Sequence, residues 1–137
     1  MLVGVGIDAV EIERMRLAVT RTPKIIEKIL STSERENLPN NFSRDNLSEN
    51  DRFISSLAAR FVAKTATLNL LGISLFGIPL RQIEIESVPG TGAPKIFIST
   101  TDDAKSRFAH ISFLCSMSHS KKEAVAVVIA QNVRENT

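Results

Sequence analysis

Tryptophan and tyrosine are absent from this chain of 137 residues, and its aromatic residues are seven phenylalanines. Proteins that bind single-stranded nucleic acid stack the bases on aromatic side chains. The net charge of +2 is also too small to attract a nucleic acid strongly. Nucleic acid is therefore not an expected partner.

Cysteine and histidine are nearly absent as well, with Cys115 alone and two histidines. This set supports neither an internal disulfide nor a zinc site. No apolar run approaches the roughly 20 residues that span a bilayer, and the first residues lack the basic start of a signal peptide. We expect one domain over residues 1–137, in the cytoplasm and without a membrane partner.

The hydrophobic patterns predict an α+β fold, an antiparallel sheet packed on one long helix with shorter helices. The long helix is expected over 51–71, with Gly72 as its C-cap. The first half of the chain is expected to hold a strand over 2–8, a helix that ends before Pro23, a short helix that begins at Pro23 with Thr22 as its cap, capping boxes at Ser31/Glu34 and Ser33/Glu36, and a polar loop over 39–51. The second half is expected to hold a hairpin over 82–87 and 95–100, a helix over 100–109, and strands over 110–118 and 123–133, the last of them central.

Asp8 is the first candidate for chemistry, because it ends an almost wholly apolar strand. A carboxylate in this position can hold a hard cation such as magnesium. It can equally cap the helix that follows. The residues alone leave both interpretations open.

Arg60 and Lys64 lie four residues apart, on one face of the long helix. Two like charges there repel each other unless an anion such as a phosphate lies between them. The alternative is a solvated edge of an amphipathic helix, which would include the neighbouring Thr65.

The segment "SMSHS" forms a third cluster, in which Ser116 and Ser118 point to one face of a strand and Cys115 and Met117 to the other. His119 lies where the strand should end, and it is either structural or catalytic. No G-x-S-x-G stretch surrounds the serines, so a serine hydrolase is not indicated.

Basic residues crowd the region 14–28, where five Arg and Lys side chains are opposed mainly by two glutamates. Such a surface suits an acidic protein partner. A solvated helix face is the other interpretation.

Four segments, "VGVGIDAVEIERM", "ARFVAKTA", "GAP" and "SMSHSKKEAVAVVI", occur in an order and spacing that resemble the holo-acyl-carrier-protein synthases, the small group of the 4′-phosphopantetheinyl transferases. The resemblance covers nearly the whole chain. It implies magnesium-dependent transfer of the 4′-phosphopantetheine arm of coenzyme A to a serine of an acyl carrier protein, for fatty acid synthesis. It also implies a homotrimer with active sites between neighbouring subunits.

The same resemblance implies roles for individual residues. Asp8 matches the magnesium-binding aspartate, and Arg14 and Arg21 match the surface that meets the carrier protein. The positions that match coenzyme A contacts are Asp8, Arg60, Lys64, Gly72, Ser118 and His119. Asp8, Lys64 and His119 are the expected catalytic residues, and the base that accepts the serine proton is either a metal-bound water or Lys64.

The sequence departs from the family pattern at two positions in the long helix. Thr65 replaces the second metal-binding glutamate, and Asn69 replaces a second lysine. A threonine hydroxyl can serve as a magnesium ligand, so we expect weaker metal affinity with activity retained. The alternatives are a homologue that binds coenzyme A or carrier protein without turnover, and an unrelated structural or nucleic-acid-binding domain.

Overall fold

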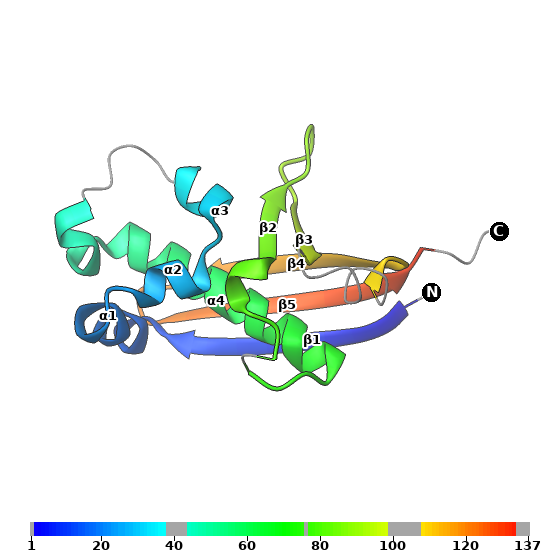
Figure 1. Cartoon of the computed structure of the whole chain (residues 1–137), viewed down its shortest axis with the longest axis horizontal. Helices are drawn as coiled ribbons and strands as arrows, with labels where there is room; N and C mark the ends of the chain where they lie inside the picture. The colour runs from blue at the N-terminus through cyan, green and yellow to red at the C-terminus, as the bar shows by residue number, and fades with distance from the viewer. Residues whose placement is uncertain (1, 38–43, 76, 99–107, 134–137) are drawn as a thin grey trace.

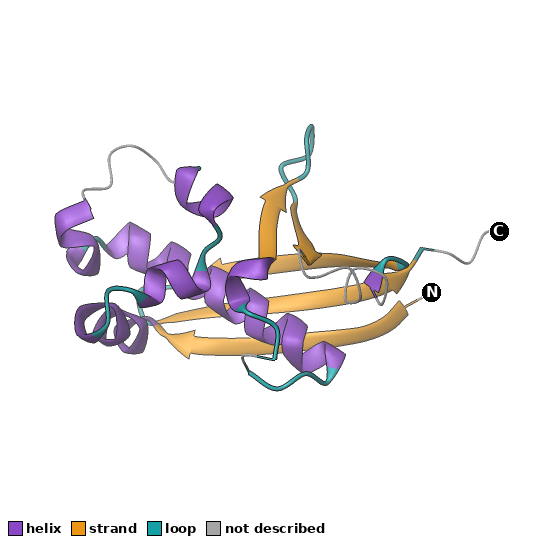
Figure 2. Cartoon of the chain, in the orientation of Figure 1, coloured by secondary structure: helices purple, strands orange, loops and turns teal. Residues whose placement is uncertain are grey.

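The computed structural model describes residues 2–37, 44–75, 77–98 and 108–133. Two layers make up this part of the chain: a five-stranded antiparallel sheet, and helices that lie over one of its faces (Figure 1, Figure 2). The expected α+β fold, with an antiparallel sheet packed on one long helix, is confirmed.

The strand order across the sheet is β1-β5-β4-β3-β2. The strands are β1 (Leu2–Glu11), β2 (Ile83–Ser87), β3 (Pro94–Ile98), β4 (Ile111–His119) and β5 (Glu123–Asn132). β5 lies between β1 and β4, as its apolar sequence predicts, and β2 and β3 form the expected hairpin. β1 continues three residues past its expected end at Asp8, because its pairing with β5 extends to Glu11 and Glu123.

The helix α4 (Asp51–Leu71) crosses the sheet over β1, β5 and β4 (Figure 1). Both of its expected ends are confirmed. The Asn50 side chain accepts a hydrogen bond from the Phe53 amide at the start, and Gly72 adopts a left-handed conformation with φ 70° at the end. No described helix is both long and apolar enough to cross a membrane.

The other helices among the described residues are α1 (Ile12–Arg21), α2 (Ile25–Ile29), α3 (Thr32–Glu36) and the 3₁₀ turns η1 (Arg44–Glu49) and η2 (Leu80–Gln82). α2 begins later than expected, at Ile25, and Thr22 does not cap it through its side chain. Of the two possible capping boxes, the one formed by Ser31 and Glu34 is present in α3. η1 replaces part of the expected polar loop, whose residues 39–43 lie outside the described ranges, as do residues 100–107 of the helix expected over 100–109.

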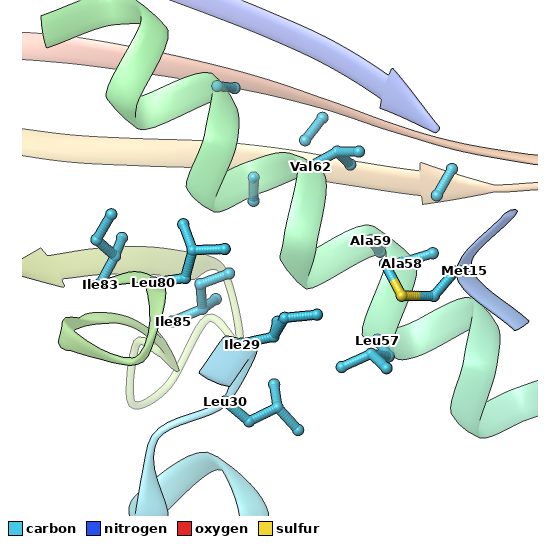
Figure 3. Close-up of a cluster of buried hydrophobic side chains, with 14 of the residues drawn as sticks. Met15, Ile29, Leu30, Leu57, Ala58, Ala59, Val62, Leu80, Ile83 and Ile85 are labelled. Atoms are coloured by element: carbon cyan, nitrogen blue, oxygen red, sulfur yellow. The ribbon is translucent and has the colours of Figure 1, made fainter. Parts of the chain in front are cut away.

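The core lies between α4 and the sheet and continues beneath α1 and α2. In Figure 3, Ile29 and Leu30 from the end of α2 lie near Leu57 of α4 and near Ile85 of β2. Where α4 meets β5 the buried residues are small, with Ala63 and Ala66 on the helix and Ala124, Ala126, Val128 and Ala130 on the strand. Small side chains let the helix approach the sheet closely.

Candidate active site

Asp8 of β1 and Thr65 of α4 meet in the layer between the sheet and the long helix. The Thr65 hydroxyl lies 2.5 Å from Asp8 Oδ2 and donates a hydrogen bond to it. The backbone amide of Ala9 donates to Asp8 Oδ1 at 2.8 Å. The residue expected to hold a cation and the residue that departs from the family pattern are therefore direct partners.

Gly6 explains why the strand and the helix come so close at this point. A Cβ atom on Gly6 would lie 2.2 Å from the carbonyl oxygen of Ala66, which no side chain can tolerate. Alternation along β1 places Asp8 on the same face as Gly6, two residues further on. The short step from strand to helix thus brings Asp8 within reach of Thr65.

The alternative in which Asp8 caps the following helix is wrong for this structure. Glu11 is the N-cap residue of α1, and its side chain makes no capping hydrogen bond. Because β1 continues to Glu11, Asp8 lies inside the strand, paired with Ala126 of β5. Its carboxylate faces α4.

Lys64 is fully buried, which differs from both interpretations of the sequence. Its side chain is 0% exposed, and its ammonium Nζ donates to Glu34 Oε1 at 2.6 Å and to the Ile29 carbonyl oxygen at 2.5 Å. The pKa of Lys64 is lowered mainly by burial, while the charge of Glu34 acts in the opposite direction. The ammonium cannot reach a bound ligand while these bonds are in place, so no contact here supports the expected role in coenzyme binding and catalysis.

Arg60 lies one turn before Lys64 and reaches the surface, with 27% of its side chain exposed. Its Nε lies 3.7 Å from Glu34 Oε2, too far for a hydrogen bond. Arg60 is therefore the cation of this pair that can meet a phosphate from solvent.

Ser118 and His119 end β4 and are exposed. Ser118 pairs with Val125, which is exposed on the open face of the sheet, whereas Asp8 pairs with the buried Ala126 on the helical face. Within one chain, Ser118 and Asp8 thus lie on opposite faces of the sheet.

Arg14 and Arg21 are exposed on α1, seven residues and two turns apart, so they share one face of this helix. Gly72 and the side chain of Asn69 are exposed at the other end of α4. The chain therefore presents its expected carrier-protein surface to solvent. Of the expected coenzyme-binding positions, Gly72, Ser118 and His119 are exposed, Asp8 and Arg60 are partly buried, and Lys64 is enclosed.

The oxygens at Asp8 fit a magnesium ion with few protein ligands. Carboxylate and hydroxyl oxygens are hard donors, and magnesium commonly uses one or two carboxylates together with water and phosphate oxygens. Among the described residues, no group of three or more His, Cys, Asp or Glu side chains is arranged to hold a metal. A cation at this site would depend on Asp8, with Thr65 beside it.

Glu34 is the residue that sequence reasoning did not assign to this region. Its capping-box pattern with Ser31 was visible in the sequence and is present, with Oε1 accepting from the Ser31 amide at 3.0 Å. The pattern gave no sign that the same carboxylate would be buried between Arg60 and Lys64. No local sequence pattern links Glu34 to Lys64, because Lys64 lies 30 residues further along the chain.

Comparison with known proteins supports the class of protein that this fold and site define. Residues 4–128 match the family model described as the 4′-phosphopantetheinyl transferase superfamily. A holo-[acyl-carrier-protein] synthase of Streptomyces griseus is 37% identical over 132 residues, which are 96% of this chain and 99% of the relative. The chain belongs to the 4′-phosphopantetheinyl transferase superfamily and, within it, to the holo-[acyl-carrier-protein] synthases, which are transferases.

Solved structures of the same family share the fold. A holo-(acyl-carrier-protein) synthase from Bacillus anthracis, in complex with CoA (3′,5′-ADP), has a TM-score of 0.73 and 28% identity, covering 96% of this chain and 98% of that one. The Helicobacter pylori holo-[acyl-carrier-protein] synthase, in complex with coenzyme A, has a TM-score of 0.71 and 28% identity, covering 93% and 99%. Both proteins bind the coenzyme that the sequence resemblance implies.

Proposed function

We propose that this chain transfers the 4′-phosphopantetheine arm of coenzyme A to a serine of an apo-acyl carrier protein, in the cytoplasm and in support of fatty acid synthesis. The observation that carries the proposal is the contact between Asp8 and Thr65, because it joins the two segments to which the sequence resemblance assigns metal and coenzyme binding. The serine hydroxyl gives up its proton to a water molecule, and its oxygen forms a bond to the phosphorus of the pantetheine phosphate. The bond from that phosphorus to the pyrophosphate bridging oxygen breaks, and 3′,5′-ADP leaves.

The residues of this chain contribute mainly by position and charge. Charge on the phosphate oxygens changes as the bond to the leaving group breaks, so cations near these oxygens stabilise the transition state. Arg60 is partly exposed on α4 and supplies one such cation. His119 lies at the exposed end of β4, where it is available to the nucleotide. A magnesium ion held by Asp8 would offset further charge on the pyrophosphate.

Arg14 and Arg21 are the proposed contacts to the carrier protein. Their shared face on α1 is positively charged and exposed. Complementary charge orients an acidic partner and raises its association rate. The nucleophilic serine then belongs to the partner, which agrees with the lack of an activated nucleophile among the residues discussed above.

We infer further that three copies assemble through the open face of the sheet. Apolar side chains are exposed there in the single chain, including Val3, Val5, Ile7, Leu114, Val125 and Ile129. A contiguous apolar surface of this kind marks an interface. Ser118 lies on this same face, so a neighbouring copy is what would bring Ser118 to a site that contains Asp8.

The decisive experiment incubates the protein with coenzyme A, magnesium and apo-acyl carrier protein and weighs the carrier by mass spectrometry. Transfer adds one phosphopantetheine arm to the carrier, and heat-inactivated protein is the control. No gain in mass at any magnesium concentration would overturn the proposed activity.

A second candidate is a homologue that binds coenzyme A or carrier protein but has lost turnover, and the threonine at position 65 favours it. Thr65 offers no second carboxylate, and its hydroxyl already donates to Asp8. This candidate predicts saturable binding of coenzyme A in calorimetry without any gain in carrier mass.

A further inference from the structure

Arg60 and Lys64 require an anion between them, and the chain itself supplies one. The Glu34 carboxylate of α3 reaches into the space beside both cations, with Oε1 at 2.6 Å from Lys64 Nζ and Oε2 at 3.7 Å from Arg60 Nε. A phosphate is therefore not needed to explain why two cations lie one turn apart on α4.

The two cations are bound to Glu34 in different ways. Lys64 is enclosed, since its ammonium also donates to the Ile29 carbonyl oxygen, and Glu34 Oε1 accepts from the Ser31 amide as well. Glu34 itself is nearly inaccessible, with 3% of its side chain exposed. A pair that is buried and hydrogen-bonded in this way persists, because removal of either partner would leave an uncompensated buried charge.

Arg60 is attracted to Glu34 but makes no hydrogen bond to it. Arg60 Nε and Glu34 Oε2 are both buried, and both lack a hydrogen-bond partner in the described structure. The Arg60 guanidinium can therefore leave Glu34 at little cost, provided that Lys64 continues to neutralise the carboxylate.

We propose that Lys64 is a positioning residue that neutralises Glu34 and thereby leaves Arg60 available to a phosphate of coenzyme A. Lys64 itself does not contact the coenzyme. The inference rests on the proposed function, since it concerns how this chain binds coenzyme A.

The inference predicts a specific pattern of rescue. In Lys64→Met, Glu34 keeps its charge and Arg60 becomes its ion-pair partner. Arg60 is then no longer available to a phosphate of coenzyme A. In the double variant Lys64→Met, Glu34→Gln, no carboxylate remains to hold Arg60, and the guanidinium is available again. If Lys64 contacted the phosphate directly, a change at Glu34 would not restore the coenzyme A affinity that is lost in Lys64→Met.

The experiment measures the dissociation constant of coenzyme A by calorimetry, at a temperature well below each variant's melting transition. We expect at least a tenfold weaker affinity for Arg60→Ala and for Lys64→Met, and an affinity within threefold of the wild type for the double variant. Glu36→Gln, an exposed position on the same helix α3, is the matched control and should bind as the wild type does.

Each other outcome contradicts the inference. A double variant that binds as weakly as Arg60→Ala would make Lys64 a direct phosphate contact. A Lys64→Met protein with lower thermal stability but unchanged affinity would make its role purely structural. If Lys64→Met fails to fold, the double variant, which lacks the buried carboxylate of Glu34, still decides between rescue and direct contact. A wild-type protein that does not bind coenzyme A would instead overturn the proposed function.

Discussion

The Thr65 hydroxyl donates a hydrogen bond to the Asp8 carboxylate across the layer between α4 and β1, at 2.5 Å. The side chain that faces Asp8 from α4 is thus a neutral donor and not a second anion. One carboxylate attracts a divalent cation less strongly than two, so the cation dependence of the reaction is where this difference should be measured.

Thr65→Glu is expected to shift the magnesium dependence of transfer to a lower concentration. The substitution restores a second carboxylate beside Asp8, which increases the attraction for the ion. The measurement is the magnesium concentration that gives half-maximal transfer to carrier protein. Thr65→Gln, which has the same length but no charge, is the control, and an unchanged dependence in Thr65→Glu would place residue 65 away from the ion.

Gly6→Ala is expected to destabilise the protein by about 1–3 kcal/mol, the usual cost of forcing extra volume into a packed contact. The added Cβ would lie 2.2 Å from the Ala66 carbonyl oxygen, so β1 and α4 must separate. Denaturant unfolding measures the loss. Gly4→Ala is the matched control, because its Cβ would meet Leu70 at an ordinary 3.4 Å. Equal stability of both variants would show that β1 and α4 do not make this close contact.

Cys115 is expected to react slowly while the protein is folded. Burial raises the pKa of its thiol from 9.0 to about 11, so at pH 8 the thiolate fraction is about 100-fold lower than in the unfolded chain. The rate of alkylation by iodoacetamide, in native buffer and in guanidinium, measures the difference. Since the folded thiol holds its proton more tightly, its contribution to the free energy of unfolding is present below pH 9 and is lost as pH rises to 11. Equal alkylation rates in both states would contradict this.

Ile7→Glu is expected to convert the proposed trimer to single chains. Ile7 is 69% exposed on the open sheet face, and a charge there would have to be buried in the interface between copies. Light scattering after size exclusion gives the mass in solution. Leu75→Glu adds the same charge at an exposed position after α4 and should leave the mass unchanged. A wild-type protein of single-chain mass would remove the basis for this prediction and for the proposed trimer.

Arg14→Glu is expected to raise KM for the carrier protein at least tenfold while KM for coenzyme A stays the same. Reversal of charge on the exposed face of α1 repels an acidic partner, and the effect should shrink with added salt. Transfer kinetics at two ionic strengths test this. Arg81→Glu, an exposed arginine in η2, is the control for a general effect of charge. If Arg14→Glu changed only the KM for coenzyme A, Arg14 would contact coenzyme A and not the carrier protein.

The sequence predicted the fold well where residue periodicity alone decides the structure. The C-terminal end of α4 follows from Gly72, and the β2–β3 hairpin follows from strict alternation. The burial of Lys64 was not predictable in this way, because it depends on a carboxylate 30 residues away. Lysine is almost always exposed unless it is paired, and pairing between distant segments leaves no periodic trace in the sequence.

The candidate site was predictable only in part, because its contacts also join segments that are distant in the sequence. Asp8 and Thr65 stood out through their place in family segments, but their contact depends on the absence of a side chain at Gly6. The separation of Ser118 from Asp8 on opposite faces follows from strand register, which becomes visible once β1, β5 and β4 are paired.

The close packing of Gly6 against Ala66 has an evolutionary consequence. It fixes the distance between strand and helix through backbone atoms, independently of the side chain at position 65. Exchange of that one side chain therefore changes the atom that faces Asp8, from a carboxylate oxygen to a hydroxyl, without remodelling the scaffold. A proposed metal ligand beside Asp8 can therefore be added or removed by a single substitution at position 65, while the contact between β1 and α4 stays the same.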